Sequence, residues 1–189
     1  MMFVVSIVIA IIIGYILKGK LRNISEFKYR GIWFIAAGFL LETCMKMLLA
    51  KGVLEIGTST FVINVIMYTL IMVFIFLNIK DKFILTIGIG FVLNIIVIFA
   101  NSCTMPVGIK AAELLNFSGE ISKLGLYSMV NSDTLFVFLA DVIPYKIGPL
   151  NGIASVGDIF ICIGIMGIII REMRKKPCKE YKEINISNY

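Results

Sequence analysis

The 189-residue sequence contains no histidine, and its four cysteines form no C-x-x-C pair. The absence of histidine excludes Ser-His-Asp triads, histidine metal ligands and histidine proton relays. The cysteine spacing indicates neither a zinc site nor a redox motif. The sequence also has no glycine-rich nucleotide loop. We therefore expect neither a cofactor nor a bound metal.

Charged residues are scarce as well, at 16% of the chain against 59% apolar residues, and the mean hydropathy is +0.97. A soluble domain has about 45–50% apolar residues. The excess lies in long apolar runs separated by short charged clusters, and runs of about 18 or more such residues are typical of transmembrane helices. The sequence predicts an all-α integral membrane protein, with one transmembrane domain over residues 1–170 and a basic cytoplasmic tail over 171–189.

Five apolar runs predict transmembrane helices at about 2–17, 31–49, 60–79, 83–100 and 152–170. Most basic residues cluster at 18–30, at 80–82 and after 170. By the positive-inside rule, these clusters face the cytoplasm. The protein is thus expected in the cell membrane, with its N-terminus outside and its C-terminus inside. The net charge of +6 reflects this orientation, and we expect no nucleic-acid partner.

Residues 101–151 are too apolar for a solvated loop and too interrupted for a span. We predict an interfacial or re-entrant helical segment on the outer side. Short helices are expected at 106–117, with Pro106 in the first turn, at 119–130, and from Thr134 to Val142. Pro144 would end the last of these, and "KIGPLNG" (146–152) would turn the chain.

Several polar residues fall within or beside the predicted spans, where they are costly and often functional. Glu42 and Lys46 are one helical turn apart, which predicts an ion pair. Asn64 and Asn94 favour hydrogen bonds between helices. The remaining polar residues are Asp158, which lies within the last predicted span, and Asn101 and Asp141, which lie near the outer edge of the membrane.

Asp141 and Asp158 flank the predicted turn, which could bring their carboxyl groups together. Two close carboxylates cannot both ionise cheaply, so one would keep its proton near neutral pH. Such a pair can activate a water and protonate a leaving group. In the alternative interpretation, Asp141 caps a turn or meets solvent, and Ser155 and Asp158 form an N-terminal cap for the last span.

The stretches "NSCTMPV" (101–107), "FLAD" (138–141) and "SVGDIFICIG" (155–164) resemble a family of small bacterial multi-span membrane proteins of unknown function. Members carry N-x-x-x-M-P-V, then an aspartate, then S-x-G-D at the head of the final span. This resemblance covers most of the chain and implies no activity.

The last third of the chain is also similar to lipoprotein signal peptidase, which uses two membrane-embedded aspartates. The resemblance implies that Asp141 and Asp158 form such a pair. The sequence departs from that family at Ser155, where the family has asparagine, and at Gly157, where it has alanine. No arginine follows Asp141, and the peptidase has four spans rather than five.

These observations predict a membrane-embedded aspartyl hydrolase or peptidase that acts at the outer face. Asp141 and Asp158 would be its catalytic residues, with Asn101 as an orienting donor. The alternatives are a non-enzymatic transporter, an accessory subunit of a membrane complex, or a structural protein whose polar residues join helices. The expected partners are the lipid bilayer and either a membrane-bound substrate or a partner protein.

Overall fold

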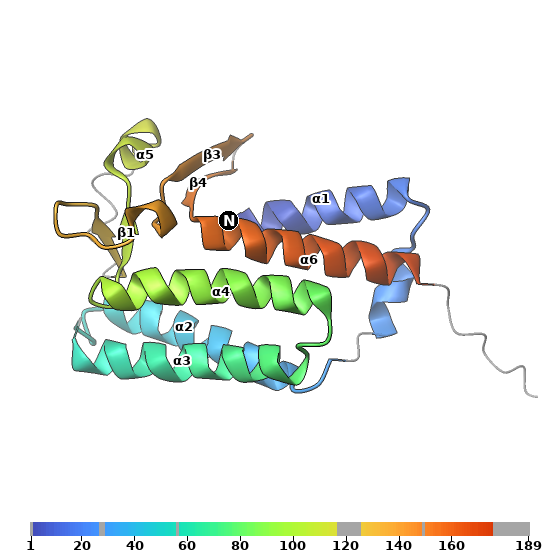
Figure 1. Ribbon diagram of the computed structural model, residues 1–189, viewed down its shortest axis with the longest axis horizontal. Coiled ribbons are helices and arrows are strands. Elements are labelled where there is room, and N and C mark those ends of the chain that lie inside the picture. Colours follow the sequence, from blue (N-terminus) through green and yellow to red (C-terminus); the bar gives the residue numbers. More distant parts are fainter. Residues whose placement is uncertain (1, 27–28, 56, 117–125, 149, 176–189) are drawn as a thin grey trace, which may run out of the picture.

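The computed structural model describes residues 2–26, 29–55, 57–116, 126–148 and 150–175, and most of these lie in five long helices (Figure 1). The helices are α1 (Met2–Ile16), α2 (Ile32–Ala50), α3 (Thr58–Leu77), α4 (Lys82–Ala100) and α6 (Val156–Arg174). Helices α2, α3 and α4 are long and apolar enough to cross a membrane, whereas α1 is apolar but shorter. That α1 and α6 also cross, which would give five spans, stays a prediction.

Helix α6 packs against α1 on one side and α4 on the other, and α2 packs against α3. Small residues allow α4 and α6 to approach closely. A Cβ atom on Gly164 of α6 would lie 2.7 Å from the carbonyl oxygen of Phe83, and one on Gly90 of α4 would lie 2.6 Å from the Ile161 side chain. The largest buried cluster contains Met67, Ile71, Phe74, Ile75, Ile84, Ile87, Ile161 and Ile168.

One end of the helix bundle, which we call the basic end, is held by Arg171 of α6. Its Nη2 atom lies 2.6 Å from Oδ2 of Asp81 and donates to the Tyr29 hydroxyl, and its Nε donates to Glu172. Asp81 also caps α4, because its Oδ1 accepts from the Phe83 amide at 2.9 Å. Burial raises the pKa of Asp81, but the hydrogen bonds from Arg171, Phe83 and Tyr29 outweigh it and hold the pKa below its ordinary value.

The described residues at the opposite end include four short strands, and we call it the strand end (Figure 1). Strand β1 (Met105–Val107) pairs in parallel with β2 (Tyr127–Met129), and β3 (Ile143–Ile147) forms an antiparallel hairpin with β4 (Leu150–Ala154). Helix α5 (Ile109–Leu114) and the 3₁₀ turn Val137–Leu139 complete this end, and a second 3₁₀ turn, Leu21–Glu26, follows α1. The strand end corresponds to the predicted outer side.

The predicted helices of segment 101–151 are largely wrong. Pro106 lies in β1 rather than in a helix, and α5 begins after Gly108. Most of the predicted helix at 119–130 lies outside the described residues, and Tyr127–Met129 is a strand. Only Val137–Leu139 is helical within the predicted helix from Thr134 to Val142, because the Asp141 amide donates to the Pro106 carbonyl instead of to a helical neighbour.

Candidate functional site

Helix α6 begins with a reciprocal cap made by Ser155 and Asp158. The Ser155 hydroxyl accepts from the Asp158 amide at 3.0 Å, and Oδ2 of Asp158 accepts from the Ser155 amide at 3.3 Å. This capping box satisfies two amides at the helix terminus, where a negative side chain is also favourable. The cap that the sequence predicts as an alternative use of these two residues is therefore confirmed.

Asn94 of α4 joins this cap from the neighbouring helix. Its Nδ2 donates to Oδ1 of Asp158 at 3.0 Å, and its Oδ1 accepts from the fully buried Ser155 hydroxyl at 2.8 Å. The predicted interhelical role of Asn94 is confirmed. Gly157 makes the contact possible, because a Cβ atom there would collide with the Asn94 amide and lie 2.6 Å from the Gly90 carbonyl oxygen.

Asp141 is held in place by its backbone alone. Its amide donates to the Pro106 carbonyl at 2.9 Å, and its carbonyl accepts from the Gly108 amide at 2.8 Å, which forms a parallel bridge to Val107. The residue is 8% exposed. Its side-chain Oδ1 is buried and has no hydrogen-bond partner among the described residues. A buried polar atom of this kind requires an explanation, because most such atoms are paired.

The surroundings of Asp141 favour its neutral form. Burial, and secondly the negative charge of Asp158, raise the pKa of Asp141 to about 8. Burial also raises the pKa of Tyr127 to about 12, with further contributions from Asp141, Glu42 and Asp158. At neutral pH, Asp141 and Tyr127 are therefore both protonated and able to donate.

Hydrogen bonds join Asn94, Ser155 and Asp158, and the charge of Asp158 influences both Asp141 and Tyr127. We call these five residues the polar cluster. Asp141 and Asp158 interact electrostatically, and no hydrogen bond joins them in the described part of the chain. The predicted ion pair between Glu42 and Lys46 is confirmed, with 2.5 Å between Oε1 of Glu42 and Nζ of Lys46. The negative charge of Glu42 also contributes to the raised pKa of Tyr127.

Asn101 has a different set of contacts. Its Nδ2 donates to the carbonyls of Val97 and Leu135, at 2.7 and 2.9 Å, and its Oδ1 accepts from the Leu135 amide at 2.9 Å. The amide thus fixes the chain that leads into the Val137–Leu139 turn and Asp141. Its predicted role as a donor to a reacting group stays a prediction.

Tyr127 is the member of the polar cluster that the sequence does not indicate. It lies on a three-residue strand whose partner is about twenty residues earlier, and no local pattern marks that pairing. Over the described residues, no group of three histidine, cysteine or acidic side chains is arranged to hold a metal ion.

A family model described as a family of unknown function, DUF5317, matches residues 26–170. The matched range is more than half of the chain and includes every residue of the polar cluster. No curated protein and no solved structure matches the chain.

Proposed function

The chain belongs to DUF5317, a family of unknown function, and from its polar cluster we propose that it is a membrane-embedded aspartyl hydrolase acting at the outer face. The observation that carries this proposal is the buried carboxyl group of Asp141, which has an unpartnered oxygen and lies in the electrostatic field of Asp158. Two carboxyl groups in different environments can divide the acid and base roles of a hydrolysis.

Asp141 is the proton donor in this proposal. Its pKa of about 8 keeps it neutral at pH 7. A general acid works best when its pKa lies near the operating pH. The backbone bridge to Val107 fixes the position of the residue without using the side chain, so loss of the proton would not remove the contacts that hold Asp141 in place.

Asp158 is the proton acceptor. Each of its oxygens accepts one N–H donor, from Asn94 and from the Ser155 amide. A carboxylate offers about four acceptor positions, so lone pairs remain for a water molecule. Asn94 and Ser155 are positioning residues, because they fix the orientation of the carboxylate.

The proposed reaction is the addition of water to a carbonyl group. Asp158 takes one proton from the water as its oxygen bonds to the carbonyl carbon. The bond from that carbon to the leaving group then breaks, and Asp141 protonates the leaving atom. Transfer of the proton from Asp158 back to Asp141 restores the pair, whose titration belongs to both groups together.

An experiment with ¹⁸O-labelled water tests this proposal without knowledge of the leaving group, because hydrolysis of any such carbonyl compound places oxygen from water in the new carboxyl group. Purified protein in phosphatidylethanolamine–phosphatidylglycerol vesicles is incubated in H₂¹⁸O with lipids and peptides extracted from membranes of cells that lack the protein. Mass spectrometry then detects new carboxyl groups that carry ¹⁸O. We expect labelled product with the wild type and none with Asp141→Asn or Asp158→Asn.

The matched control is Asp133→Asn, which removes an exposed carboxyl group from the same segment and should leave labelling unchanged. Melting curves establish that each variant is folded. Labelling that persists in folded Asp141→Asn and Asp158→Asn, or that is absent from the wild type, would overturn the proposal.

A further inference from the structure

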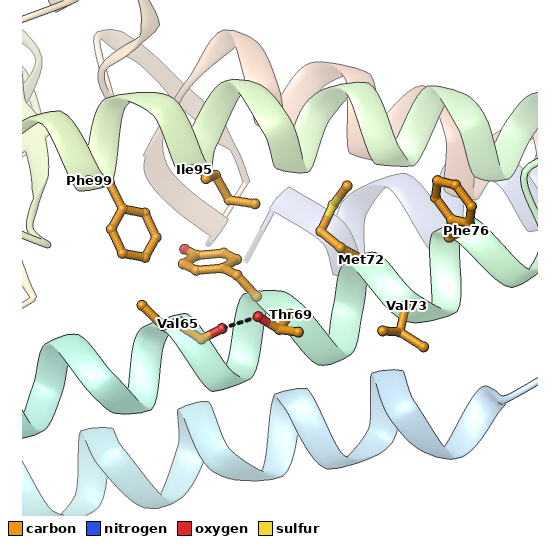
Figure 2. Close-up of a pocket in the computed structure, with 8 residues that line it drawn as sticks. Val65, Thr69, Met72, Val73, Phe76, Ile95 and Phe99 are labelled. Atoms are coloured by element: carbon orange, nitrogen blue, oxygen red, sulfur yellow. Dashed lines mark hydrogen bonds between the residues drawn. The ribbon is translucent and has the colours of Figure 1, made fainter.

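An apolar groove runs between α3 and α4 (Figure 2). Its volume is about 430 Å³, and it is lined by Val65, Tyr68, Thr69, Met72, Val73, Phe76, Ile95 and Phe99. Both helices are long and apolar enough to cross a membrane, so the groove lies at a depth where lipid is the surrounding solvent. Six of its eight residues are on α3, which therefore forms one wall along most of the groove.

The polar atoms of the groove are few, and the Thr69 hydroxyl is already satisfied. It donates to the Val65 carbonyl at 2.7 Å, as Figure 2 shows. A second transmembrane helix usually docks through small residues and interhelical hydrogen bonds. This groove presents bulky aromatic and thioether side chains instead, and such surfaces suit a flexible apolar chain.

The length of the groove also fits a lipid tail. Val65 and Phe76 mark its two ends on α3, and eleven residues of helix rise by about 16 Å. That distance is about half of the ~30 Å hydrocarbon core of a bilayer, which is the share of one leaflet. An extended acyl chain of a membrane lipid therefore has about the same length as the groove.

Tyr68 lies at the end of the groove that faces the strand end. Its ring packs edge-on against Phe99, with 6.0 Å between ring centroids, and its phenol interacts electrostatically with Glu42, Tyr127 and Asp158. The end of the groove near Phe99 therefore faces the strand end and lies within the electrostatic influence of Asp158, and the end near Phe76 points toward the basic end of the bundle.

We infer that the α3–α4 groove binds one acyl chain of a membrane lipid, and that the substrate is an acylated amphiphile whose scissile carbonyl lies at the polar cluster. The first part stands on the groove itself, and the second rests on the proposed function. An occupant with an apolar tail and a carbonyl head matches both the length of the groove and the proton donors at its end.

Photo-crosslinking tests the binding of the acyl chain. Full-length protein carrying Asp141→Asn, so that no turnover occurs, is reconstituted with phosphatidylcholine that bears a diazirine on its acyl chain. After illumination, crosslinked peptides are mapped by mass spectrometry. We expect adducts concentrated on the groove-lining side chains of α3 and α4.

Val73→Phe fills the groove and should lower the adduct yield there several-fold. Val73 is exposed, so the larger ring costs no core packing. The matched control is Ile66→Phe on the same helix, at an exposed position outside the groove lining, which should leave the yield unchanged. Adducts spread evenly over all exposed apolar residues, or an adduct yield in the groove that Val73→Phe leaves unchanged, would overturn the inference.

The substrate class has its own readout. In the ¹⁸O experiment with active protein, Val73→Phe should reduce labelling of acylated products several-fold relative to Ile66→Phe. Adducts without any labelling would refute the hydrolase and leave the lipid site. Labelling that is equal in the two variants would refute the acyl-chain substrate and leave the hydrolase.

Discussion

Replacing Asp141 with asparagine should change how the stability of this protein depends on pH. The carboxyl group has a pKa of about 8 in the folded chain, against an ordinary value of 3.8. Because the folded pKa is the higher one, the folded state holds a proton that the unfolded state has lost between about pH 4 and pH 8. The contribution of Asp141 to stability is therefore fully present below pH 4 and is lost as the pH rises through 8.

The size of the effect follows from proton linkage. Between pH 5 and pH 7 the two states differ by nearly one proton, so the free energy of unfolding falls by about 1.4 kcal/mol per pH unit, or about 2.7 kcal/mol in total. For a chain of this size, 1 kcal/mol corresponds to about 2–4 °C in melting temperature. The Asp141→Asn variant lacks this titration and should gain about 5–11 °C relative to the wild type over the same interval.

The assay is thermal unfolding in detergent micelles, followed by circular dichroism at several pH values for both proteins. Other acids titrate in both and cancel in the difference. Asp158, Tyr127 and Tyr145 act electrostatically with Asp141, and Asp158→Asn should move the end of the Asp141 titration to lower pH because it removes a negative charge. Asp133→Asn should follow the wild-type curve. Parallel curves for Asp141→Asn and the wild type would refute the reasoning.

Four further predictions concern the framework of the helix bundle and of the segment that leads to Asp141. Gly157→Ala should lower stability by about 1–3 kcal/mol in a melting experiment, because its methyl group has to displace Asn94 or the Gly90 backbone, whereas Gly57→Ala meets no atom within 4 Å and should be nearly neutral. Arg171→Met should cost about 2–4 kcal/mol by the same measurement, because it leaves Asp81 and the buried Glu172 without the guanidinium. Asp81→Asn should lower the free energy of unfolding at neutral pH. This difference from the wild type should shrink in melting curves as the pH falls through the lowered pKa of Asp81, because the wild-type carboxylate then becomes protonated and loses its stabilising charge. Asn101→Ala should accelerate hydrogen exchange at the Leu135 amide with little effect at the Asn94 amide, and equal acceleration at both sites would contradict the local role of Asn101.

The positions of the long helices could be read from the sequence because hydropathy alone sets them. In lipid a backbone must satisfy its own hydrogen bonds, so a long apolar run has little choice but to be helical. The helix that follows the first basic cluster occupies Ile32–Ala50, against a predicted 31–49. Helix α6 differs more from its predicted position, because it begins at Val156 rather than near 152. Strand β4 extends to Ala154, and Ser155 then caps the helix.

The strand end could not be read in the same way. Strands β1 and β2 have three residues each, too few for an alternating pattern, and they pair across about twenty residues of sequence. "PVGIKAAELLNF" looks helical throughout, yet Pro106 pairs in a sheet and the helix covers Ile109–Leu114. Tertiary hydrogen bonds, such as that from the Asp141 amide to Pro106, decide this region, and local propensity does not encode them.

The two aspartates illustrate how far a structural role explains a polar residue. Asp158 serves the fold, since its spacing from Ser155 provides a helix cap, and the sequence alone indicates this. Asp141 stabilises the fold through the hydrogen bonds of its backbone amide and carbonyl. Any residue except proline, which has no amide hydrogen, would make the same two bonds. The Asp141 side chain adds the cost of burying a carboxyl group with one oxygen unpaired, and an apolar residue of similar size would avoid that cost. The fold therefore accounts for a residue at position 141 but not for an acid, and the proton donation that we propose for Asp141 would supply a reason for the acid.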